Sequence, residues 1–215
     1  MGNNITELVF ILDMSGSMQG LRSDTIGGFN SMIEKQRAET GVAFVSTVLF
    51  NTESKVVHDR VPLEKVEPMT DREYTPMGGT ALLDAVGSAI HHIGNIHKYA
   101  RPEDVPENTL FVITTDGMEN SSVHYDLKKV KKMIERQQER YGWKFIFLGA
   151  NIDAAQTAHS MGIAREYAAD YCADSSGSEV MYSAMCEAVT CTRKKAPSMN
   201  WRRLLDEDNA KRKAR

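Results

Sequence analysis

The chain has 215 residues, of which 41% are hydrophobic and 26% are charged, an ordinary composition for a globular protein with a sizeable core. Its formal net charge of −3 argues against a general affinity for nucleic acid. The charge is unevenly spread, because residues 193–215 hold nine Lys or Arg and three Asp or Glu, a net of +6, which leaves −9 for the first 192 residues.

The N-terminus and the cysteines indicate a cellular compartment. The start MGNNITELVF lacks the basic region of a signal peptide, and no apolar run is long enough to cross a bilayer. Cys172, Cys186 and Cys191 are odd in number and show no C-x-x-C spacing, so neither a disulfide framework nor a zinc site is expected. We therefore expect a cytoplasmic protein with free thiols and no membrane attachment.

The first predicted element is a short strand over residues 8–12, a continuous apolar run that is typical of a strand buried on both faces. Hydrophobic periodicity and turn residues divide the rest of the chain. Further strands are predicted over residues 41–50, 55–61, 109–115, 143–148 and 165–171. Helices are predicted over residues 19–40, 81–99, 126–141, 154–161 and 178–192, and a proline-punctuated loop covers residues 62–79.

Apolar strands that alternate with helices predict an α/β fold that is doubly wound and Rossmann-like. In its three layers, helices cover both faces of a mostly parallel sheet of about six strands. The partly polar segment 55–61 is expected to be a hairpin partner at the sheet edge. Right-handed crossovers place the first strand beside strand 109–115, where the winding reverses and ligands bind in such sheets. We expect one domain over residues 1–192 and a mobile basic tail over residues 193–215.

Oxygen-bearing side chains follow both of these central strands. The first strand ends in Asp13, Ser15 and Ser17, strand 109–115 is followed by Asp116, and the paired glycines before helix 81–99 lead into Thr80. Singly, each has a plainer role, as a loop residue bonding its own backbone or as a helix cap. Together they supply two carboxylates and three hydroxyls, the hard oxygen ligands that Mg²⁺ takes beside water. So little negative charge would leave the cation partly uncompensated, and an open position would attract a carboxylate from outside.

These residues resemble the metal-ion-dependent adhesion site (MIDAS) of the von Willebrand factor A (VWA) domain family. The D-x-S-x-S loop is present as Asp13-Met14-Ser15-Gly16-Ser17, the distal threonine as Thr80 in GGTALLD, and the distal aspartate as Asp116 in TTDG. The resemblance covers roughly residues 5 to 192 and implies a mostly parallel sheet with one antiparallel edge strand. It implies that Ser15, Ser17 and Thr80 bind Mg²⁺, Mn²⁺ or Ca²⁺ directly, with Asp13 and Asp116 often acting through water.

The same resemblance implies a non-enzymatic module whose metal captures a Glu or Asp from a partner protein. Intracellular bacterial members work with AAA+ ATPases, in chelatase-like complexes, or in stress and tellurite-resistance systems, and the sequence selects none of these.

Two other functions remain as alternatives. One is a Mg²⁺-dependent phosphoryl-transfer or hydrolytic enzyme that uses Asp13 as nucleophile. Against it, aspartyl-phosphate phosphatases of the haloacid dehalogenase type want a second Asp where this chain has Ser15, and G-x-x-x-x-G-K and G-x-S-x-G motifs are absent. The other is a nucleic-acid-associated adaptor that binds through the basic tail, although most such tails are simply solvated.

Overall fold

The structure is a computed structural model that describes residues 4–196 and 200–214. Its strands are β1 (Ile5–Asp13), β2 (Val42–Phe50), β3 (Ser54–Pro62), β4 (Asn108–Thr115), β5 (Lys144–Gly149) and β6 (Ala168–Asp170). Its α-helices are α1 (Arg22–Arg37), α2 (Leu82–Tyr99), α3 (Leu127–Tyr141), α4 (Ala154–Ser160), α5 (Ser175–Arg193) and α6 (Arg203–Lys213). Short 3₁₀ turns are η1 (Gly16–Leu21), η2 (Leu63–Lys65), η3 (Pro102–Asp104) and η4 (Arg165–Tyr167).

The six strands form one sheet in the order β3-β2-β1-β4-β5-β6, and its pairs are parallel except β2–β3. The predicted α/β class, the antiparallel edge strand and the adjacency of the first strand to strand 109–115 are confirmed. The winding reverses between β1 and β4, because the chain first builds outward on one side of β1 and then on the other. Both central strands end at the same edge of the sheet.

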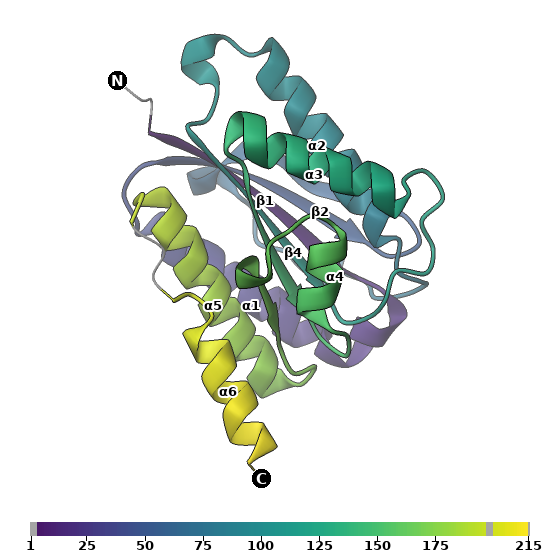
Figure 1. Cartoon of the computed structure of the whole chain (residues 1–215). Coiled ribbons are helices and arrows are strands. Elements are labelled where there is room, and N and C mark those ends of the chain that lie inside the picture. Colours follow the sequence, from purple (N-terminus) through teal and green to yellow (C-terminus); the bar gives the residue numbers. More distant parts are fainter. Residues whose placement is uncertain (1–3, 197–199, 215) are drawn as a thin grey trace.

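Helices cover both faces of the sheet, as Figure 1 shows, with α1 and α5 on one face and α2 and α3 on the other. The alternation of side chains along β1 explains this arrangement. Leu8, Phe10 and Leu12 join the core beneath α1, α5 and α6. Val9 and Ile11 join the core beneath α2, α3 and α4. The two cores hold the central strands rigidly, and so fix the loops that follow them.

The C-terminal segment differs from the predicted mobile tail. In the described residues 200–214 it forms helix α6, and Trp201 and Leu205 are buried against the body of the protein. The net charge of the segment gave no sign of this helix, because a net charge does not show that each of the three acidic residues lies one helical turn from an arginine. The resulting ion pairs are Arg202–Asp206, Arg203–Glu207 and Arg212–Asp208. Residues 197–199 and 215 of the predicted tail lie outside the described residues, and the domain boundary near residue 192 stays a prediction.

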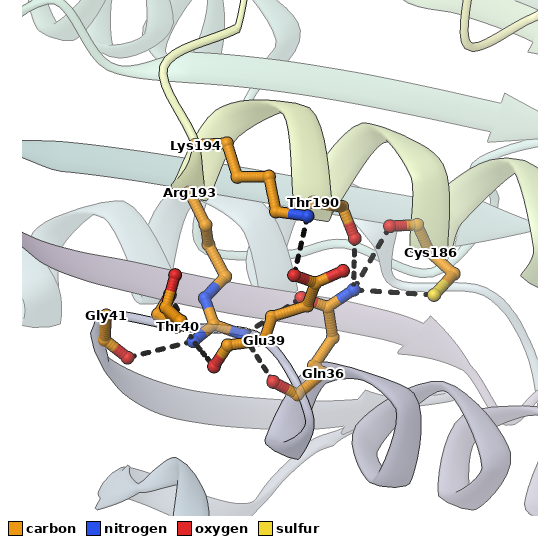
Figure 2. A network of polar contacts seen from close by, with 8 residues as sticks. All are labelled: Gln36, Glu39, Thr40, Gly41, Cys186, Thr190, Arg193 and Lys194. Carbon is orange, nitrogen blue, oxygen red and sulfur yellow. Dashed lines mark hydrogen bonds and ion pairs between the residues drawn. The ribbon is translucent and has the colours of Figure 1, made fainter.

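Arg193, the first residue of the predicted tail, is buried at the end of α5 (Figure 2). Its guanidinium donates to the backbone carbonyls of Gln36 at 2.5 Å and Gly41 at 2.9 Å, and to two carbonyls between them at longer range. Gln36 in turn donates its side-chain amide to Thr190 Oγ1 at 2.8 Å. This network satisfies the free carbonyls where α1 ends, and it joins α1 to α5.

Candidate functional site

Asp13 occupies the centre of the candidate site, at the end of β1. One carboxylate oxygen accepts the backbone N–H of Ser15 at 2.7 Å. The other accepts the hydroxyl of Thr115 at 2.6 Å and faces the backbone N–H of Asp116 at 3.4 Å. Asp13 therefore joins the loop that follows β1 to the end of β4, as the adjacency of the two strands requires.

A chain of hydroxyls connects this loop to the second carboxylate. The Oγ atoms of Ser15 and Ser17 lie 3.1 Å apart, and Ser17 Oγ donates to Asp116 Oδ1 at 2.6 Å. Asp13, Ser15 and Asp116 are buried, whereas Ser17 is exposed. The structure thus brings four of the five predicted site residues together, with Ser17 nearest to solvent.

Thr80, the fifth predicted residue, lies on the loop that precedes α2. Its backbone N–H donates to Asn120 Oδ1 at 2.9 Å, and its carbonyl accepts the N–H of Asn120 at 3.1 Å. Its hydroxyl lies beside Gly117, where a Cβ atom would come within 3.9 Å of Thr80 Oγ1. Gly78 has φ of +70°, which favours glycine, and its carbonyl accepts the N–H of Gly16 at 3.1 Å. The three loops therefore meet around the predicted residues.

The electrostatics of the site are unusual because its two carboxylates form no ion pair with a basic side chain among the described residues. Burial raises the pKa of Asp13 above its ordinary value, and the carboxylate of Asp116 acts in the same direction, whereas hydrogen bonds from Ser15 and Thr115 oppose the shift. Within residues 4–196 and 200–214, no Lys, Arg or His forms an ion pair with either Asp13 or Asp116.

Glu7, at the other end of the same strand, provides a direct contrast. It is fully buried, but its carboxylate accepts Arg60 Nε at 2.7 Å and lies 3.5 Å from His97 Nε2. Strand β1 thus carries Glu7, a buried acid with a cationic partner, near one end and Asp13, a buried acid with no such partner in the described part of the chain, at the other. A bound cation is the plainest way to complete the second arrangement.

The donor set fits a hard divalent cation. The part of the chain that the structure describes contains no cluster of three or more His, Cys, Asp or Glu that could hold a metal ion, so the candidate site depends on hydroxyl oxygens beside its two carboxylates. Carboxylate, hydroxyl and water oxygens are the ligands of Mg²⁺, Mn²⁺ and Ca²⁺, and thiols or imidazoles that would favour softer metals are missing from this set.

Sequence reasoning missed several residues that shape the site. Tyr74 is buried and donates its hydroxyl to the carbonyl of Asp13 at 2.6 Å, although it lies 61 positions away in a loop without secondary structure. Thr115 directly bonds the Asp13 carboxylate, and its place beside Asp116 in TTDG was the available hint. Asp84, one turn into α2, accepts the backbone N–H groups of residues 123–125 and so fixes the end of the loop that follows Asp116.

Comparison with solved structures identifies the fold as that of the VWA domain. The VWA domain of the pilus tip protein Mfa5 of Porphyromonas gingivalis superposes with a TM-score of 0.64 at 9% identity, over 91% of this chain and 98% of that one. The manganese-loaded TRAP protein of Plasmodium vivax superposes with a TM-score of 0.57 at 15% identity, over 84% of this chain and 73% of that one.

A third similar structure is proximal thread matrix protein 1 of the mussel byssus, with a zinc-occupied MIDAS motif. It has a TM-score of 0.59 at 12% identity and matches over 86% of this chain. This chain spans about half the length of the mussel protein chains. No protein-family model and no curated protein matches the sequence. In the portion of the chain that is described, none of the helices has the length and apolar character needed to cross a membrane.

Proposed function

We propose that this protein is a metal-dependent protein-binding module. Asp13 and Asp116 would supply negative charge to Mg²⁺, Mn²⁺ or Ca²⁺, and Ser15, Ser17 and Thr80 would supply hydroxyl oxygens. The bound cation would offer an electrophilic position to a Glu or Asp of a partner protein. The observation that carries the proposal is the pair of carboxylates at the ends of β1 and β4, for which the described residues supply no basic partner.

The chain's own residues prepare this site in two ways. Backbone N–H groups and Thr115 hold the Asp13 carboxylate in a fixed orientation, so little ordering remains to be done when a cation binds. Ser17, which is exposed, donates its hydroxyl hydrogen to Asp116. Because a hydroxyl rotates freely, that hydrogen can turn away and leave an oxygen lone pair free for a metal.

Manganese titration tests the metal site, with Mn²⁺ followed by electron paramagnetic resonance or calorimetry. We expect one ion per chain, and a loss of about tenfold or more in affinity for Ser17→Ala, as is typical when the surroundings of a metal are altered. Ser31→Ala, at another exposed serine, is the matched control and should bind like the wild type. Equal affinity for Ser17→Ala and the control would reject the site.

A pull-down in Mg²⁺ and in EDTA tests the binding function, with Asp13→Ala as the second negative control. Partners recovered only by the wild type in Mg²⁺ would support the proposal. An AAA+ ATPase or a component of a stress-response complex among them would place the protein in the setting that the family resemblance implies. We propose a binding protein rather than an enzyme, and metal-dependent hydrolysis that Asp13→Ala abolishes would overturn this.

A further inference from the structure

We infer that the partner's captured acidic residue is flanked by apolar residues, because three exposed apolar side chains, Met77, Met118 and Val123, here called the rim, lie on the loops that carry the candidate site. This inference rests on the proposed function and specifies the partner's chemistry.

The rim residues are strongly exposed and lie close to the site in sequence. The exposed fractions are 59% for Met77, 75% for Met118 and 81% for Val123. Met77 precedes Thr80 by three residues, and Met118 follows Asp116 by two. Single exposed apolar residues are normal on a protein surface, but three on the loops around one polar site are the pattern of an interaction surface.

Backbone hydrogen bonds hold these loops against one another. The N–H of Met77 donates to the carbonyl of Met14 at 3.0 Å, and the N–H of Gly16 donates to that of Gly78 at 3.1 Å. On the other side, Asn120 donates to the carbonyl of Thr80 at 3.1 Å. Met77 is therefore presented from the segment that carries Thr80, and Met118 from a loop that contacts this segment.

The three loop segments that carry the site residues hold few charged side chains for a partner's flank, and the nearest charged residues in sequence are Arg22 and His124, just beyond their ends. Residues 13–21, 75–81 and 115–123 contain no Lys, Arg or His and three acids, Asp13, Asp116 and Glu119. The first two belong to the site. Glu119 is directed inward, where it accepts the backbone N–H groups of Leu83, Ser121 and Ser122 at 2.8–2.9 Å and the hydroxyl of Ser122 at 2.7 Å. A partner acid would thus find a cation at the centre and apolar side chains at the edge.

The loop that carries Met118 and Val123 is held in shape by polar contacts rather than by these apolar side chains. Glu119 and Asn120 fix its first half, and the carboxylate of Asp84 fixes its second half through the N–H groups of Val123, His124 and Tyr125 at 2.8–2.9 Å. The exposed side chains of Met118 and Val123 therefore stand on an ordered loop, which lowers the entropic cost of binding. Methionine is flexible and polarisable, so it adapts to varied apolar partners.

Selection from a random phage-displayed library of 12-residue peptides tests the inference. The full chain is immobilised in Mg²⁺, and bound phage are eluted with EDTA. We expect enrichment of Asp or Glu with Leu, Ile, Phe or Met within two residues on either side. Enrichment of Asp or Glu with polar flanks would overturn this inference and leave the metal-dependent capture intact. If EDTA released no acidic peptides at all, the proposed function would fail, and the inference with it.

Variants of the rim give the second measurement. A selected peptide should bind Met118→Ser or Val123→Ser about tenfold more weakly by fluorescence polarisation, equivalent to about 1.4 kcal/mol. Manganese affinity should be unchanged, since neither side chain supplies a ligand. The matched control is Val56→Ser, an exposed valine on edge strand β3. Equal peptide affinity for the rim variants and the control would refute the role of the rim.

Discussion

Two buried carboxylates on β1 are expected to respond in opposite ways to the same chemical change, from carboxylate to carboxamide. Glu7 and Asp13 lie at opposite ends of one strand, and both are almost wholly buried. Glu7 has a cationic partner in Arg60, whereas the charged neighbour that acts on Asp13 is another acid, Asp116. We therefore compare Glu7→Gln with Asp13→Asn in metal-free protein.

Glu7→Gln should destabilise the protein because it leaves Arg60 without its anion. Removing one member of a buried ion pair typically costs about 3–5 kcal/mol. The side chain of Arg60 is 21% exposed, so water recovers part of this loss, and we expect about 2–3 kcal/mol. For a chain of this size, that corresponds to a fall in Tm of about 4–12 °C.

Asp13→Asn should leave the metal-free protein within about 1 kcal/mol of the wild type, or make it more stable. The substitution removes the repulsion from Asp116 and the cost of burying an unpaired charge. The two short hydrogen bonds of this side chain can be kept, because a carboxamide N–H can donate to Thr115 Oγ1, whose own hydrogen can then go to the carbonyl of Gly117, 3.0 Å away. Only the 3.4 Å contact with the N–H of Asp116 is lost. The Ser15 N–H still finds a carbonyl oxygen.

Thermal and urea unfolding followed by circular dichroism, first in EDTA and then in Mg²⁺, measure the contrast. In EDTA, only Glu7→Gln should lose stability. In Mg²⁺ at 100 times its Kd, the wild type and Glu7→Gln should each gain about 2.7 kcal/mol, and Asp13→Asn should gain far less. If Asp13→Asn lost as much stability in EDTA as Glu7→Gln, the charge of Asp13 would already be compensated within the protein, and the reasoning behind the metal site would be wrong.

Three further predictions concern the rest of the molecule. Arg193→Met should lower the free energy of unfolding by about 3 kcal/mol because it leaves the carbonyls at the end of α1 without donors. The control Lys194→Met, at the neighbouring exposed position, should cost less than about 1 kcal/mol, and urea unfolding measures both variants. Burial lowers the pKa of His58 below 6.5, so the unfolded chain binds the proton more readily than the folded one. The free energy of unfolding should therefore fall by up to about 1.4 kcal/mol per pH unit as the pH drops below 6.5 towards the lowered pKa, and His58→Gln should flatten this slope. Leu205→Ala should cost about 2 kcal/mol if α6 is packed as described, and no change in Tm would support a mobile tail instead.

Most of the fold could be predicted from hydrophobic patterning. The strands β1, β4 and β5 each contain a continuous run of four or five apolar residues because helices cover both faces of the sheet, and that pattern is distinctive. The boundaries were less predictable. The predicted helix from residue 19 begins as the 3₁₀ turn η1 before α1, because the loop after Asp13 must first turn back across the sheet edge.

The candidate site was predictable to the extent that its residues follow strands. Asp13 and Asp116 mark the ends of adjacent strands, so topology alone brings them together. The supporting residues were not predictable in this way. Tyr74 reaches Asp13 from a long irregular loop, and the carboxylate of Glu119 accepts four hydrogen bonds within the protein. Neither hydrophobic periodicity nor a sequence motif indicates where such a side chain points.

The direction of single side chains also explains why the C-terminal segment was wrongly predicted to be a solvent-exposed tail, a prediction that relied on its net charge. Arg193 and Lys194 are adjacent and chemically alike, yet one is buried against backbone carbonyls and the other pairs with Glu39 at the surface. Helix geometry separates them, because consecutive residues point about 100° apart around the helix axis. The side of the helix on which a charged residue lies thus decides which acceptors it meets. Five carbonyl oxygens from one turn region, four of the backbone and one of the Gln36 side chain, accept from the two terminal nitrogens of the buried Arg193 guanidinium, while its Nε–H has no partner among the described residues. Asp13 presents the opposite case, since its donors orient the carboxylate but leave its charge unneutralised, which is why we assign the missing positive charge to a bound cation.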